Sequence, residues 1–306
     1  MSPLSVPPRV TIVEVGPRDG LQNEKTVVSA ADKIAFVNLL TAAGPPVIEV
    51  GAFVSAKWVP QMAATGSVLS DIHRSPHTRY PVLVPNMQGF ERARAAGAEE
   101  IAMFAAASET FSRKNINQTI DESFKAYALV CQAALAVGMR VRGYLSTCFG
   151  CPYEGPVPPS RVAALAARMR EMGVFEVSIS DTIGVAHPGQ VPLVVGAVVE
   201  RLPLSDIALH FHDTRGTALA NVLMGLQLGV TTYDASCGGL GGCPYAPGAA
   251  GNLATEDLVY MLDGLGVETG VSLEKLLEAS KFIQQRVGHR LPSRYVQAAI
   301  ASGDVG

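Results

Sequence analysis

The sequence has few aromatic residues, few cysteines and no long apolar run. Only 6% of its 306 residues are aromatic, and five are cysteines. Five cysteines are too few in a chain of this length for a disulfide framework. Because the number is odd, at least one thiol stays free. No apolar run reaches the roughly 20 residues of a membrane-spanning helix. The first residues, MSPLSVPPRV, also lack the apolar core of a secretory signal. We therefore expect a cytoplasmic protein with no membrane partner.

The sequence also lacks a block of like charges. Lysine and arginine number 24 against 27 aspartates and glutamates, so the net charge is only −3. This balance argues against nucleic acid as a partner. The chain is instead rich in apolar residues, at 48%, and can bury a large aliphatic core.

Short β-rich runs alternate with longer runs whose apolar residues recur at helical spacing. The predicted strands are residues 9–15, 46–50, 79–85, 100–106, 140–146, 175–180, 207–213 and 231–236. The predicted helices between them include residues 31–44, 87–98, 123–138, 160–173, 192–202 and 217–229, and two further helices follow over about residues 254–286.

Eight strands, each followed by a helix, predict a (β/α)8 TIM barrel with additional C-terminal helices. We expect a single domain, with the barrel over about residues 9–265 and the helical addition over about 266–300. A doubly wound sheet is the alternative, but it would carry a glycine fingerprint after its first strand. The turn at 15–25, VGPRDGLQNEK, is polar and charged instead.

Polar and ionisable residues follow the predicted strands, at the rim where barrel enzymes bind their substrates. These residues are Arg18, Asp19, Glu49, Asn86, Asp181, His210, His212, Cys243 and Asn252. These residues come from many separate segments, and no one segment requires them to gather at the same rim. We therefore expect an active site there.

Two histidines end the seventh predicted strand. His210 and His212 are two residues apart, so both side chains lie on one face of the strand. With Asp19 they form the two-histidine, one-carboxylate set that holds a divalent cation and leaves positions open, and the Asn252 amide oxygen is a further ligand. Taken alone, two histidines at this spacing are more often a chance pair in a buried strand than a metal site. The rim position and Asp19 favour a metal site, and a closed structural zinc site would be richer in cysteine.

The segment 237–252 contains six glycines and predicts a mobile lid at the barrel mouth. Cys243 at its tip is a candidate proton donor or acceptor, although an unreactive cysteine in a phosphate-binding loop is the alternative. The predicted lid residues are Gly239, Gly241, Gly242, Cys243 and Gly248. Cys148 and Cys151 form a lone CxxC pair, which we interpret as structural.

Arg18 beside a cation has the chemistry to stabilise an enolate or a carboxylate. An arginine at a strand end is also often only a salt-bridge partner. Glu49 and Asp181 are interpreted mainly as residues that orient Arg18 or the histidines.

Several motifs together resemble the 3-hydroxy-3-methylglutaryl-CoA lyase family. They are EVGPRDGLQNEK (14–25), FVSAKWVPQM (53–62), NINQTIDESF (115–124), GCPYEG (150–155), DTIGV (181–185), HFHDTRG (210–216) and GGLGGCPYAPGAAGNLATEDLVYML (238–262). The resemblance covers about residues 9–290 and keeps the order of the motifs.

The resemblance implies a retro-Claisen cleavage of 3-hydroxy-3-methylglutaryl-CoA to acetyl-CoA and acetoacetate, in leucine catabolism and ketone body formation. It also implies a Mg²⁺ or Mn²⁺ cofactor, an acyl-CoA substrate and a homodimer. By motif match, Asp19, His210, His212 and Asn252 take the metal positions, and Arg18 and Cys243 take the enolate-stabilising and proton-donating positions. Glu49, Asp181 and Glu256 match polar positions around the site. We further predict that Glu49 and Asp181 are catalytic residues, that Gln22 and Asn86 bind the substrate, and that Glu256 is a supporting residue.

The chain departs from the family's usual residues near the rim, and these departures keep other functions open. The differing positions are Ala52, Ala56, Ser180, Arg215, Cys237 and Gly238. One alternative is a lyase for a bulkier 3-hydroxy-acyl-CoA, and a second is a Claisen-type acyl-CoA synthase. A third is a non-catalytic barrel that binds acyl-CoA, against which the intact Asp19 and Cys243 argue.

Overall fold

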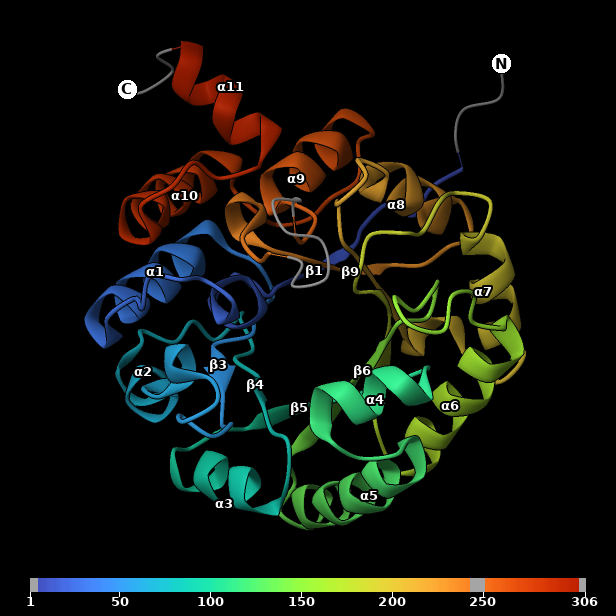
Figure 1. Ribbon diagram of the computed structural model, residues 1–306. Helices are drawn as coiled ribbons and strands as arrows, with labels where there is room; N and C mark the ends of the chain where they lie inside the picture. The colour runs from blue at the N-terminus through green and yellow to red at the C-terminus, as the bar shows by residue number, and fades with distance from the viewer. Residues whose placement is uncertain (1–4, 243–250, 303–306) are drawn as a thin grey trace.

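A computed structural model of the protein describes residues 5–242 and 251–302. In that part of the chain, parallel strands form a ring that is surrounded by helices (Figure 1). The strands are β1 (Thr11–Glu14), β2 (Val47–Ile48), β3 (Gly51–Ala52), β4 (Val82–Leu83), β5 (Glu100–Ala106), β6 (Arg140–Ser146), β7 (Glu176–Asp181), β8 (Ile207–Phe211) and β9 (Thr232–Ala235).

The predicted second strand is split into β2 and β3, and this split closes the ring. β2 pairs with β1, whereas β3 pairs with β4, so the two halves of one strand join the two ends of the sheet. Hydrogen bonds continue across the break, because the Glu49 N–H donates to Glu14 O at 2.9 Å and the Val50 N–H to Pro81 O at 3.0 Å. The nine strands therefore act as the eight of the predicted barrel, which is confirmed.

A helix follows each of the eight barrel strands. They are α1 (Ala30–Ala43), α2 (Thr65–Asp71), α3 (Met87–Ala95), α5 (Ile120–Ala136), α6 (Pro159–Glu171), α7 (Val191–Val199), α8 (Ala218–Gln227) and α9 (Thr255–Gly264). The short α2 was not predicted. Within the described residues, no helix is both long and apolar enough to span a membrane.

Three further helices, α4 (Glu109–Ile116), α10 (Leu273–Val287) and α11 (Arg294–Ser302), lie outside the eight strand–helix units. α4 precedes α5 and contacts β5, and it is capped by Ser108, whose side chain accepts the Phe111 N–H. α10 packs against both α9 and α1, so it completes the outer ring, and α11 packs on α9 (Figure 1). The C-terminal addition is thus partly a component of the barrel wall.

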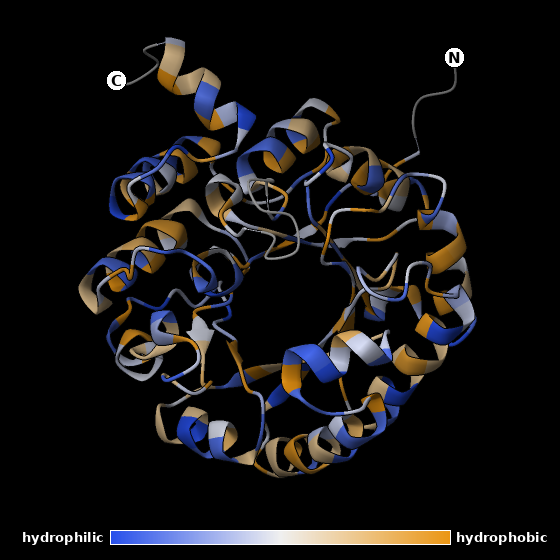
Figure 2. Cartoon of the chain, viewed as in Figure 1, coloured by the Kyte–Doolittle hydropathy of each residue, from blue (hydrophilic) through white to orange (hydrophobic). Residues whose placement is uncertain are grey.

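The main apolar core lies between the sheet and the helices. Phe36 and Leu40 of α1, Ile101 of β5 and Val195 of α7 belong to one buried cluster that extends around the molecule. Hydrophobic and hydrophilic residues alternate along the outer helices (Figure 2), as amphipathic packing on a barrel requires.

Inside the ring, by contrast, polar side chains meet. The register sets His210 beside Asp234 and beside Ser180 on neighbouring strands. Arg142 of β6 is only 1% exposed and makes ion pairs with Glu176 at 2.6 Å and Asp234 at 2.8 Å. A barrel interior is usually filled by layers of branched aliphatic residues, so this polar layer departs from the usual composition.

Two buried glutamates hold the loops that follow β1 and β9. Glu14 accepts hydrogen bonds from the N–H groups of Gly16 at 2.7 Å and Cys237 at 2.8 Å, and from the Thr255 hydroxyl. A Cβ at position 16 would lie 2.6 Å from the Glu14 carboxyl oxygen, so the turn needs glycine there.

Glu256, at the start of α9, holds the second loop. Both of its oxygens accept the Gly238 N–H, at 2.9 and 2.8 Å, and the Ser280 hydroxyl donates to one of them. Glu256 is completely buried, and in this way it supports the base of the glycine-rich segment.

Burial raises the pKa of Glu14 to about 7 and that of Glu256 to about 8, although their hydrogen bonds partly oppose the shift. The folded protein then keeps protons that the unfolded chain has already released. We predict that the free energy of unfolding falls as the pH rises from about 5 to 8, by up to about 1.4 kcal/mol per pH unit for each group. Urea unfolding at several pH values measures this slope, and Glu256→Gln should flatten it. An equally steep slope in that variant would contradict the prediction.

Candidate active site and metal centre

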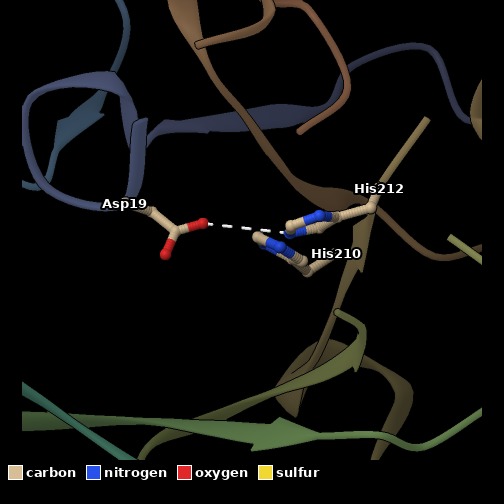
Figure 3. Close-up of side chains that lie close together, drawn as sticks. All are labelled: Asp19, His210 and His212. Atoms are coloured by element: carbon tan, nitrogen blue, oxygen red, sulfur yellow. Dashed lines mark ion pairs between the residues drawn. The ribbon is translucent and has the colours of Figure 1, made fainter. Parts of the chain in front are cut away.

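Asp19, His210 and His212 meet at the C-terminal rim of the barrel (Figure 3). Their candidate ligand atoms lie within 4.8 Å of one another. Asp19 comes from the five-residue π-helix η1 (Gly16–Gly20), which begins directly after β1, and His210 lies in β8. The histidine rings point the same way, with centroids 5.2 Å apart, as their spacing of two residues predicts.

This cluster fits a divalent cation. Mg²⁺ binds its ligands at about 2.0–2.1 Å, so neighbouring ligand atoms lie about 3–4 Å apart. The distance from Asp19 Oδ2 to His212 Nε2 is 4.0 Å. Burial and the neighbouring His210 lower the pKa of His212 to about 3, so its imidazole is neutral and keeps a lone pair for a cation.

Asn252 lies next to the cluster and offers a further oxygen. It forms a β-bridge with His212, and its Nδ2 donates to Asp19 Oδ2 at 2.9 Å. Its Oδ1 is buried and has no hydrogen-bond partner among the described residues. A half-turn of the amide would present this oxygen to a cation held by Asp19. Gly241 (φ 111°) permits the contact, because a Cβ there would lie 2.5 Å from Asn252 Nδ2.

Arg18 is held on two sides by carboxylates. Its Nε donates to Glu49 Oε2 at 2.6 Å and its Nη1 to Asp19 Oδ1 at 2.6 Å, and Glu49 also accepts the Tyr144 hydroxyl at 3.1 Å. The guanidinium lies over the Tyr144 ring, 5.2 Å from the centroid. Arg18 is therefore fixed in orientation by Glu49 and Asp19.

These contacts keep the charges in place. Burial would lower the pKa of Arg18, but Glu49 and Asp19 raise it above its ordinary value. Burial alone would raise the pKa of Asp19, but the Arg18 guanidinium and the two imidazoles hold it well below its usual range. The site thus combines a fixed cation with a carboxylate that stays ionised.

A pocket of about 190 Å³ opens beside these groups. Arg18, Asp19, His210 and His212 line one part of it, and the apolar residues Leu83, Phe104 and Phe111 line another. Gln22 also lines the pocket, and its Oε1 is buried without a hydrogen-bond partner in the described part of the chain. Gln22 is therefore positioned to contact a ligand.

Two residues predicted at the site have other contacts. Asn86 is exposed and does not line the pocket, and its side chain accepts the Gly89 N–H at 2.9 Å as the N-cap of α3. Asp181 uses both carboxyl oxygens to accept the N–H groups of Val185, at 3.1 Å, and Ala186, at 2.8 Å. Asp181 thus holds the turn after β7, whereas the sequence predicted that it orients Arg18 or the histidines.

The glycine-rich segment begins and ends at this mouth. Gly239 and Gly241 have left-handed backbones, and Gly242 lines the pocket. Cys243 and Gly248 lie outside the described residues. On the far side, the Gly251 carbonyl accepts the Asp213 N–H at 2.8 Å, next to His212.

The remaining cysteines are buried and free. The Cys148 thiol donates to Leu145 O at 2.9 Å, and Cys151 lies 2.9 Å from the Ser108 hydroxyl. The CxxC pair thus has local packing contacts, in agreement with a structural role.

Sequence reasoning missed three polar residues of the barrel interior, namely Tyr144, Arg142 and Asp234. The sequence did contain a signal of polar residues inside the barrel. Arg142 and Tyr144 are two residues apart in a predicted strand and so share one face, and Asp234 lies within the predicted strand TTYDAS. A charged residue in the middle of a buried strand needs a partner. The identity of that partner, however, depends on the register between strands.

The fold and this site define a (β/α)8-barrel protein with a candidate metal centre beside a fixed arginine at the C-terminal rim. The model of the HMGL-like family matches residues 9–283. The chain therefore belongs to the HMGL-like family.

Relatives agree along nearly the whole chain. The mitochondrial hydroxymethylglutaryl-CoA lyase of Rattus norvegicus is 55% identical over 294 residues, which cover 96% of this chain and 90% of that protein. The crystal structure of hydroxymethylglutaryl-CoA lyase from Pseudomonas aeruginosa matches with a TM-score of 0.96 and 48% identity, over 97% of this chain and 99% of that one. An HMG-CoA lyase from Acinetobacter baumannii, in complex with coenzyme A and 3-methylmalate, matches with a TM-score of 0.90 and 37% identity over 95% of each chain.

We predict that His212→Ala lowers the affinity for Mn²⁺ at least tenfold, because one of three close ligand atoms is removed. Isothermal titration calorimetry of the metal-free protein measures the change. His187→Ala is the matched control, since His187 is exposed and lies outside the cluster. Equal Mn²⁺ affinities of the two variants would show that His212 is not a ligand.

Proposed function

We propose that this chain is a divalent-metal-dependent lyase that cleaves 3-hydroxy-3-methylglutaryl-CoA to acetyl-CoA and acetoacetate. The observation that carries the proposal is the contact between Arg18 and Asp19 within one pocket, with both histidines beside them. A fixed positive group then lies next to a candidate cation site. Such a pair suits a reaction that creates negative charge on substrate oxygens. The family and the relatives named above support the same reaction.

Asp19, His210 and His212 would hold Mg²⁺ or Mn²⁺, with the Asn252 oxygen as a further ligand. When bound, the cation supplies acidification of the substrate's tertiary hydroxyl and polarisation of its oxygens. Asp19 and Asn252 would supply the oxygen ligands that suit Mg²⁺ and Mn²⁺, and the two histidines would add nitrogen ligands.

Arg18 has the central role in bond breaking. The tertiary hydroxyl gives its proton to a base or to water. When the bond between C2 and C3 of the acyl chain then breaks, its electron pair moves to the thioester as an enolate, and C3 becomes the ketone of acetoacetate. Since Glu49 and Asp19 occupy Nε and Nη1 of Arg18, Nη2 is available to the enolate oxygen. The guanidinium is oriented before the charge develops, which avoids reorganisation during the reaction.

Cys243 is proposed to return a proton to C2 of the enolate, which gives acetyl-CoA. It lies outside the described residues. Support comes from the neighbouring Gly242, which lines the pocket, and from the family motif. The segment from 239 to 248 is proposed as a lid that excludes water while the enolate exists.

The acyl group would lie against Leu83, Phe104 and Phe111, which are the apolar residues of the pocket. Gln22, which lines the same pocket, would contact a polar group of the substrate.

Incubation with a panel of 3-hydroxy-acyl-CoAs and Mg²⁺ or Mn²⁺, with products identified by mass spectrometry, tests the proposal. We expect acetyl-CoA and acetoacetate from 3-hydroxy-3-methylglutaryl-CoA, and no turnover in EDTA. Faster cleavage of a bulkier homologue would correct the substrate. Binding without cleavage of any member would refute the lyase.

The homodimer and the cytoplasmic location stay predictions. Sedimentation velocity of the purified protein decides the first, and fractionation of the source cells decides the second.

We predict that Arg18→Lys lowers kcat about 10²–10³-fold with little change in KM. A lysine cannot bridge Glu49 and Asp19 while also presenting a planar fork, and the enolate charge exists only after bond breaking begins. Steady-state kinetics separates the two constants. Arg94→Lys on the surface of α3 is the control for the same chemical change. A rise in KM alone would mean that Arg18 only binds the substrate.

We predict that Cys243→Ser keeps the fold and Mn²⁺ binding but loses about 10²–10⁴-fold in turnover, because a hydroxyl is a far weaker acid than a thiol. Wild-type Cys243 should also be alkylated by iodoacetamide, and acyl-CoA should slow that reaction. Cys131 is the internal comparison, because burial raises its pKa to about 12. Near-normal turnover of Cys243→Ser would assign the proton to another donor.

A further inference from the structure

His210 has a carboxylate partner on the neighbouring strand. In the register of β8 with β9, His210 and Asp234 are directly paired residues, so their side chains leave the same face of the sheet side by side. The distance from His210 Nδ1 to Asp234 Oδ2 is 3.3 Å, and both side chains are buried. This contact engages Nδ1 and leaves Nε2 as the nitrogen of His210 that can bind a cation.

Asp234 is itself held from two other directions. Arg142 Nη2 donates to Oδ1 at 2.8 Å, and the Ser178 hydroxyl donates to Oδ2 at 2.7 Å. Each oxygen of Asp234 therefore accepts a hydrogen bond from a group of fixed position on another strand. In this setting Asp234 acts as an acceptor, so the proton of its contact with His210 belongs on the histidine Nδ1.

His212 differs in this respect. Its Nδ1 is buried, and the described part of the chain contains no hydrogen-bond partner for it. The Nε2 atom of His212 lies 4.0 Å from Oδ2 of Asp19. The two histidines of the pair thus have unequal support: His210 is held by the barrel, whereas within the described residues His212 is positioned mainly by its backbone.

We propose that Asp234 is a positioning residue that keeps His210 in its Nδ1–H tautomer, with the lone pair of Nε2 directed to the cation site. Ser178 and Arg142 hold Asp234 in place for this role. The inference rests on the proposed function only in so far as a cation binds at Asp19 and the histidines. A carboxylate that accepts from the second nitrogen of a ligating histidine typically contributes 10–100-fold to metal affinity.

The simpler alternative is that Asp234 serves only as a counter-ion for the buried Arg142. The chain offers a matched control, because Glu176 is the second counter-ion of Arg142, at 2.6 Å, and no hydrogen bond connects it to His210. A purely structural role predicts similar effects of Asp234→Asn and Glu176→Gln. A positioning role predicts an effect of Asp234→Asn alone on His210 and on metal affinity.

Asp234→Asn keeps the shape of the side chain but changes the hydrogen bonds. Arg142 is a donor only, so the amide oxygen should face Arg142 and the amide NH₂ should face Ser178 and His210. His210 Nδ1 would then have to accept, and its proton would move to Nε2. The lone pair needed for a cation would be lost without any change in the volume of the site.

Nitrogen-15 NMR of histidine-labelled, metal-free protein reads the tautomer directly, with the His210 signals assigned by their loss in His210→Gln. We expect Nδ1–H in the wild type and in Glu176→Gln, and Nε2–H in Asp234→Asn. Calorimetric titration with Mn²⁺ should show a 10–100-fold loss of affinity in Asp234→Asn. Glu176→Gln should stay within about threefold of the wild type, even where thermal unfolding shows that it is less stable.

An Nε2–H tautomer in the wild type overturns the proposal without the use of any variant, so it stays testable if Asp234→Asn does not fold. Equal losses of Mn²⁺ affinity in Asp234→Asn and Glu176→Gln also overturn it. If the wild type binds no Mn²⁺, the cation site of the proposed function fails. In that case the tautomer measurement still decides whether Asp234 keeps His210 in its Nδ1–H form, since it is made without metal.

Discussion

The barrel closes through the interrupted second strand, and the active site depends on that closure. β2 pairs with β1 and β3 pairs with β4, while the backbone at Glu49 and Val50 carries the hydrogen bonds across the gap. At the same point the Glu49 side chain binds Arg18. Glu49 therefore serves both the closing of the sheet, through its backbone, and the orientation of Arg18, through its side chain. Both contacts bring the ends of the first and second strands together.

A second constraint is the buried charge inside the ring. Arg142 is completely enclosed and has Glu176 and Asp234 as partners. Such a cluster is weak evidence for stability, because the desolvation of the ions can exceed their attraction. Its value lies in geometry, since paired ions in a low dielectric permit few orientations. Asp234 transmits that restriction to His210, and through it to the proposed cation site.

Much of the fold could be predicted from the sequence, because each strand and helix of such a barrel has its own local pattern of apolar residues. Alternating β-rich and helical periods gave the strands, and the spacing of His210 and His212 placed both rings on one face. The short α2 escaped detection, since seven residues carry little periodic signal. The capping role of Asn86 and the turn contacts of Asp181 also escaped, because the same residue types serve as helix caps, turn acceptors and catalytic groups.

The sequence by itself determined which residues stand at the ends of strands, and hence that Asp19 and the histidine pair belong to one rim. Parallel strands in a closed barrel all end on the same side, so this required no knowledge of contacts. Only the tertiary structure decided that Asp234 is the partner of His210 and that Tyr144 shares Glu49 with Arg18. The first pair depends on the register between β8 and β9, where a shift of one residue would turn each side chain to the opposite face. The second pair joins β6 to the break between β2 and β3, which are not its neighbours in the sheet, so it depends on the closed barrel.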